Sequence, residues 1–153
     1  MTEQAALLWK ALELRTPAML RAIESLADDQ FQWGPPNGAS SIAWLLWHIA
    51  EVEDNWVRDK LYRQPRRFPF GGSVRDATRD ACPGKEALLG YFHEVRALSR
   101  ERLEASSDAQ LRGTVHDEHF GELTAGDVWV GVATSGAWHG GQIVMLANRF
   151  VPR

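Results

Sequence analysis

Two histidines lie in apolar segments of the sequence, where an imidazole could bind a metal ion or transfer a proton. His48 follows the residues IAWLLW, and His139 stands within VATSGAWHGGQIV. Residues three or four positions apart share one face of a helix, so Ser135, His139 and Gln142 would point to the same side. Three hydrogen-bonding side chains on an otherwise apolar face predict a polar pocket in the interior.

The segment around His48 supplies a second set of polar and aromatic groups. His48 falls at the edge of the apolar stripe of its helix, near Trp44 and Asn55. At ~1.5 Å per residue, His48 is ~12 Å from the start of its helix and His139 is ~15 Å from the end of its own. The two rings would therefore meet if these helices are antiparallel. They could share zinc, nickel, copper or iron(II), or they could be buried histidines that hydrogen-bond to Ser135, Asn55 or Gln142.

Four stretches with apolar residues at spacings of three and four predict the helices that position these side chains. The first begins at the capping residue Thr2 and reaches about Leu26 with a kink at Pro17, and the second runs from a cap at Ser40 to Tyr62. The other two cover about Leu88–Leu103 and Val128–Phe150. No segment predicts a strand, and residues 63–83 are expected to form a long crossing loop.

Four amphipathic helices favour an all-α, four-helix bundle, with residues 1–153 as a single domain. The long loop can reach the full length of a helix, so the second and third helices could run parallel. We expect an up-down-down-up bundle, with a simple up-down bundle as the alternative.

Charge and composition limit the partners and the location. A formal charge of −3 without a basic stripe argues against nucleic acid, and no apolar run approaches the ~20 residues that span a bilayer. The single Cys82 cannot form an internal disulfide, and the N-terminus resembles no secretion signal. We expect a cytoplasmic protein whose partner is a small molecule.

Aromatic residues suggest two further features. Trp47 is expected on the outer side of its helix, where an exposed indole would favour a homodimer. The crossing loop is expected to cover one mouth of the bundle, with Phe68 or Phe70 turned inward. Glu51 is expected to point away from the core, farther out than His48.

Other candidate groups fit the surface better than a reactive site. His116, Asp117, Glu118 and His119 are expected in a solvated loop, because such residues favour the surface. His93 is expected to be exposed, and Cys82 to be an unreactive loop residue. No nucleophile motif or phosphate-binding glycine loop is visible.

Two segments, SSIAWLLWHIAEVEDNW and LTAGDVWVGVATSGAWHGGQI, resemble the signature helices of the DinB/YfiT-like superfamily. The resemblance implies a four-helix bundle, often dimeric, with a metal held by one histidine of the second helix and an H-x-x-x-H pair of the last. It assigns His48 and His139 as metal ligands and places Ser135 where the pair has its first histidine. A serine hydroxyl is a poor replacement for imidazole at a borderline metal such as zinc.

Two hypotheses of function follow. The first is a metal-dependent enzyme, a thiol transferase or hydrolase-like lineage with a degenerate ligand set, which would use zinc, nickel or iron. Here the resemblance implies a low-molecular-weight thiol as the partner. The second is a metal-free, non-catalytic binding protein or structural homodimer that keeps the pocket of His48, Trp44, Asn55, Ser135, His139 and Gln142.

Overall fold

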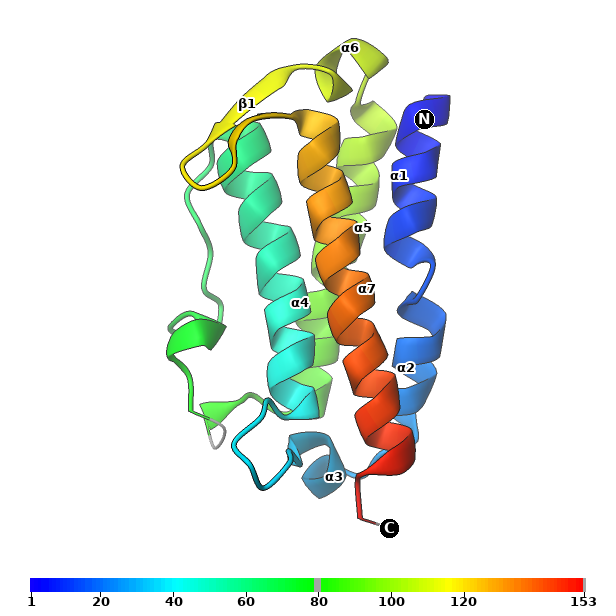
Figure 1. Ribbon diagram of the computed structural model, residues 1–153, viewed down its shortest axis with the longest axis vertical. Helices are drawn as coiled ribbons and strands as arrows, with labels where there is room; N and C mark the ends of the chain where they lie inside the picture. Colours follow the sequence, from blue (N-terminus) through cyan, green and yellow to red (C-terminus); the bar gives the residue numbers. More distant parts are fainter. Residues whose placement is uncertain (79–80, 153) are drawn as a thin grey trace.

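The structure is a computed structural model that describes residues 1–78 and 81–152, and it is mostly helical (Figure 1). Its elements are α1 (Glu3–Glu13), α2 (Thr16–Glu24), α3 (Asp28–Gln32), α4 (Ile42–Trp56), a π-helical turn η1 (Val57–Leu61), a 3-10 turn η2 (Val74–Asp76), α5 (Lys85–Ala105), α6 (Asp108–Leu111), β1 (Thr114–Asp117), β2 (Gly121–Thr124) and α7 (Ala125–Arg149). The long helices lie side by side, with α4 and α5 running in one direction and α1, α2 and α7 in the other (Figure 1). Within the described part of the chain, no helix combines the length and the apolar character needed to cross a membrane.

The first expected helix is two helices. Thr2 caps α1, as predicted, by accepting a hydrogen bond from the amide of Ala5. The helix then ends near Leu14, and Pro17 occupies the first turn of α2, where its missing N–H costs nothing. Proline therefore divides the helix instead of kinking it.

The break leaves a helix-end carbonyl that a buried arginine satisfies. Leu12 O accepts hydrogen bonds from Thr16 Oγ1 at 3.1 Å and from Arg96 Nη1 at 2.7 Å. Arg96 also pairs with the fully buried Glu53 at 2.9 Å. The core consists of two apolar clusters, one built around Ile23, Phe31, Leu46, Phe92 and Ile143 and the other around Leu8, Val57, Leu103, Trp129 and Val132. Along the sequence of α4 and α5, Glu53 and Arg96 lie between residues of the first cluster and residues of the second.

Helix α4 begins one residue later than predicted and is buried on more sides. Ser41, not Ser40, caps it by accepting from the Trp44 amide at 3.1 Å. Trp47 is only 3% exposed, because the crossing segment covers the side of α4 that we expected to face water. Its ring meets Phe70 edge to face, with centroids 5.5 Å apart. The prediction of an exposed Trp47 is wrong, and the argument for a dimer that rested on it is lost.

The crossing segment, residues 63–83, runs along the flank of α4 and does not close a mouth of the bundle (Figure 1); residues 79–80 lie outside the described part. Polar side chains of α4 hold it in place. Asp54 accepts from Arg67 Nε at 2.8 Å, and the Asn55 amide group bonds both the N–H and the carbonyl of Arg67. Phe70 packs against the core, as predicted for one of the two phenylalanines, whereas Phe68 is 40% exposed.

A short hairpin precedes α7, so the expectation of no strand is wrong. β1 and β2 pair antiparallel, with Thr114 opposite Thr124 and Asp117 opposite Gly121. Asp117 is buried rather than solvated, because it pairs with Lys60 and accepts from the amides of His119 and Phe120. A four-residue strand of mixed composition shows too few repeats of the two-residue pattern to be distinguished from a loop by sequence alone.

Candidate functional site

The structure brings the two candidate histidines together. His48 on α4 and His139 on α7 have ring centroids 4.8 Å apart and planes at 86°. Trp44, one turn before His48, stacks on its ring with centroids 4.9 Å apart and an angle of 14°. The counting of helical turns in the sequence predicted this meeting, because both residues lie at one level of antiparallel helices.

The remaining predicted pocket residues lie on two sides of the pair. Gln142 Oε1 is 2.7 Å from His139 Nδ1, and Ser135 lies half-buried one turn before His139. Asn55, by contrast, is committed to the crossing segment through Arg67. Asn55 therefore positions the wall of the site and is not a partner of either histidine.

His48 is a neutral imidazole at physiological pH. Burial, and to a lesser extent the charges of His139 and Arg75, together lower its pKa to about 4. Its Nδ1 is buried without a hydrogen-bond partner among the described residues. An imidazole in this state can donate one hydrogen bond and accept another, but it is a weak base.

A cavity of about 270 Å³ lies beside His48, between α4, the crossing segment and the hairpin. Its aromatic lining comes from Trp56, Phe68 and Phe120, and its charged lining includes Lys60, Arg66 and Arg75. The π-helical turn at the end of α4 carries Lys60 to the hairpin, where it pairs with Asp117 and lies 5.0 Å from the centre of the Trp56 ring. The cavity thus combines an apolar surface with a basic rim.

Glu51 is the main residue of this site that sequence reasoning missed. It is 7% exposed and accepts from Ser73 Oγ at 2.5 Å and from the Val74 amide at 2.9 Å. Trp44 Nε1 donates to the Val74 carbonyl at 2.9 Å, so Glu51 and Trp44 hold the same turn. The prediction that Glu51 points away is wrong. The signal was present, since positions 48, 51 and 55 share one helical face.

These side chains form an incomplete ligand set for a metal ion. A catalytic zinc site commonly uses three protein ligands, and the described residues contain no group of three or more His, Cys, Asp or Glu placed to hold one. Glu51, one turn after His48, accepts a hydrogen bond from the crossing segment on each of its oxygens. His48 and His139 therefore offer two imidazoles, with a serine where a third would complete the set.

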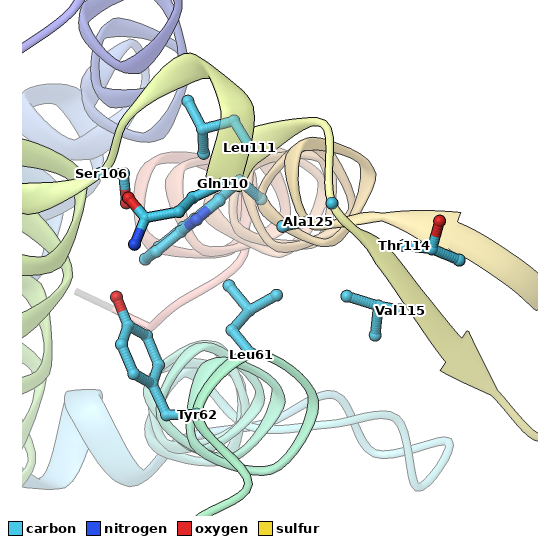
Figure 2. A pocket seen from close by; sticks show the side chains of 10 residues that line it. Leu61, Tyr62, Ser106, Gln110, Leu111, Thr114, Val115 and Ala125 are labelled. Atoms are coloured by element: carbon cyan, nitrogen blue, oxygen red, sulfur yellow. The ribbon is translucent and has the colours of Figure 1, made fainter.

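A second cavity, of about 240 Å³, lies at the end of the molecule near α6 (Figure 2). Tyr62 and Leu61 approach it from the end of η1 and face Gln110 and Leu111 (Figure 2). The described residues that line it include no histidine, carboxylate or cation. Its chemistry is that of a small apolar space with a few hydroxyl and amide groups.

The other titratable candidates lie apart from the pair. His93 is exposed on α5, as predicted, and Cys82 is half-buried against the main core just before α5. His116 and His119 are exposed on the hairpin, and His119 reaches the rim of the cavity beside His48. Sequence reasoning did not connect the hairpin to the site, because the residues are more than sixty positions from His48.

Comparisons with known proteins agree with this fold. A family model described as DinB superfamily matches residues 11–143. The chain is also similar in structure to a protein described as "conserved protein of locus from Enterococcus faecalis", with a TM-score of 0.80, 17% identity, and coverage of 99% of this chain and 98% of that one. No curated protein sequence matches. The family match includes both histidines, and the chain belongs to the DinB superfamily.

Proposed function

We propose that this chain binds a small molecule in the cavity beside His48 without a resident metal. The observation that carries the proposal is a neutral, half-buried imidazole at the wall of an open cavity with aromatic and charged lining. Binding pockets for small molecules combine such apolar surface with a few polar groups that fix orientation. The second cavity has no comparable polar group.

The walls of this cavity are held rigidly, which favours binding. Glu51, Asp54 and Asn55 each tie α4 to the crossing segment, and Lys60 ties it to the hairpin. A preformed site loses less conformational entropy when the ligand binds. We infer that these buried polar contacts serve to keep the cavity open and shaped.

Nuclear magnetic resonance on the full chain tests this proposal with a set of drug-fragment-sized molecules. The resonances that shift when a fragment binds should be mainly those of Val52, Phe68 and Ser73. His48→Gln should weaken the binding of that fragment about tenfold. His93→Gln is the matched control, because His93 is exposed on α5, and it should leave binding unchanged. Shifts confined to Leu61 and Gln110 would assign binding to the second cavity and refute the proposal.

A metal-dependent thiol transferase lineage is the second candidate, and one observation favours it. The contact between His139 Nδ1 and Gln142 leaves Nε2 of His139 available, and metal-bound histidines commonly have such a partner on the other nitrogen. His48 and His139 would be the ligands, and a metal there would supply Lewis acidity to a thiol or water. Metal analysis of untagged protein should find less than one equivalent of zinc, nickel or iron if the first proposal holds.

We further propose an up-down-down-up four-helix bundle that pairs with a second copy through the outward face of α7. Residues 128–148 contain no Asp, Glu, Lys or Arg. Trp138 is 69% exposed, and Val130 and Met145 are about half exposed on the same face. An uncharged face has no like-charge repulsion against its own copy, and a two-fold axis would place the two tryptophans in one interface.

A further inference from the structure

The charges around the cavity beside His48 are unequally compensated. Both carboxylates in its lining are committed to the protein: Glu51 to Ser73 and Val74, and Asp117 to Lys60 and to two backbone amides of the hairpin. Both carboxylates are also buried, with Glu51 7% and Asp117 4% exposed. They are therefore poorly placed to receive the cation of a ligand.

The cations of the rim differ in whether they have an ion-pair partner. Lys60 is paired with Asp117, and Arg66 Nε and Nη2 both bond Asp59, at 3.1 and 2.9 Å. Arg75 has no ion pair or side-chain hydrogen bond among the described residues, although it lies on the cavity lining. It is close enough to His48 for its charge to help lower the pKa of that imidazole. Glu51 also has no ion pair among the described residues, but its carboxylate is buried beneath the crossing segment, whereas Arg75 is exposed. The charge that a ligand can reach at this cavity is therefore the positive charge of Arg75.

Aromatic rings on the cavity lining supply an apolar surface for the rest of the ligand. Trp56 and Phe120 have ring centroids 6.1 Å apart, and Phe68 adds a third ring from the crossing segment. Phe120 and Phe68 are 63% and 40% exposed, so their faces are open to a ligand. A ligand that covers these rings removes apolar area from water, which favours binding.

We infer that the ligand of this cavity carries a carboxylate or phosphate group that binds Arg75 beside His48, and an apolar or aromatic part that packs on Trp56, Phe68 and Phe120. This inference rests on the proposed binding function and specifies the class of ligand. Arginine is suited to the anion because its planar guanidinium donates two parallel hydrogen bonds. The imidazole of His48, on the same lining, can add a third hydrogen-bond donor.

The test uses the full chain and three probes that share one ring: phenylacetate, phenyl phosphate and the uncharged phenylacetamide. Binding is followed by the imidazole resonances of His48. Either anion should bind at least tenfold more tightly than the amide, because only the anions can form an ion pair with the Arg75 guanidinium. The better of the two anions identifies the carboxylate or the phosphate as the preferred group.

Variants at Arg75 test the preference for an anion separately from the proposed binding of small molecules. Arg75→Gln should weaken binding of the preferred anion about tenfold and leave binding of the amide unchanged. Arg75→Lys should keep part of the anion preference, and Arg21→Gln, an exposed arginine on α2, should change nothing. If the amide binds as well as the anions, or Arg75→Gln has no effect on them, the inference fails while the binding function stands. If none of the three probes binds, both fail.

Discussion

His48 and His139 lie edge to face at 4.8 Å, each on a different helix and each with a different constraint on its ring. The His139 ring is oriented by Gln142, whereas His48 is stacked on Trp44 and has a buried, unpartnered Nδ1. Two imidazoles this close repel each other if both are in the positively charged imidazolium form. The pair therefore favours the neutral form of His48.

Stability should fall as the pH drops from 6.5 to 4 because of His48. Its pKa is about 4 in the folded chain and near 6.5 unfolded, so in this interval the unfolded chain binds the proton more readily. The loss should be on the order of 1–2 kcal/mol, less than the full shift implies because the ring is partly screened by solvent. Urea unfolding at a series of pH values should show a steeper loss for the parent than for His48→Gln. Equal slopes would contradict the shift.

Ser135→His should create a three-imidazole face with His48 and His139, because positions 135 and 139 are one helical turn apart. We expect zinc or nickel to bind at least tenfold more tightly than to the parent, or ~1.4 kcal/mol. Isothermal titration measures the gain. The gain should vanish when His48→Ala or His139→Ala is added, and a gain that survives either change would place the metal elsewhere.

Asp54→Asn should loosen the crossing segment. Asp54 is 2% exposed and bonds Arg58, Arg67 and the Tyr91 hydroxyl, so the variant leaves buried donors without their charged partner. We expect a loss of about 2–4 kcal/mol in the free energy of unfolding and faster hydrogen exchange in residues 66–77. Asp59→Asn is the control: the Asp59–Arg66 pair is about half exposed, and its loss should cost under about 1 kcal/mol.

Arg96→Met should be strongly destabilising, by about 3–5 kcal/mol, because it leaves Glu53 buried without its cation. Burial raises the pKa of Glu53, and removing Arg96 should raise it further. Adding Glu53→Gln should recover part of the loss, since no unpaired charge then remains. Urea unfolding of the two single variants and the double variant measures the coupling, and strict additivity would show that the pair does not interact.

Trp138→Asp should shift a dimer toward monomer in sedimentation, without loss of helical content by circular dichroism, because Trp138 is 69% exposed on α7. Trp47→Asp should instead unfold the chain, since that indole is buried against Phe70. A parent that sediments as a monomer at all micromolar concentrations would refute the proposed interface.

The sequence by itself determined the helical class, the approximate extent of the long helices and the level at which His48 and His139 lie. These properties follow from the periodicity of apolar residues and from the fixed rise of a helix, which are local. The family could also be named from two short segments. Pro17 marked an interruption of the first helix, and the structure shows two helices there, with Arg96 bonding the Leu12 carbonyl at the break.

Only the tertiary structure decided which side of α4 is covered. The sequence pattern presents Trp47 and Glu51 as an outer face, and they are buried because the crossing segment packs against that face and Glu51 hydrogen-bonds its Val74 amide. The cavity beside His48 arises in the same way, from residues of α4, the crossing segment and the hairpin that are far apart in sequence. Periodicity shows that a helix has faces, but contacts between distant segments determine which of those faces meet water.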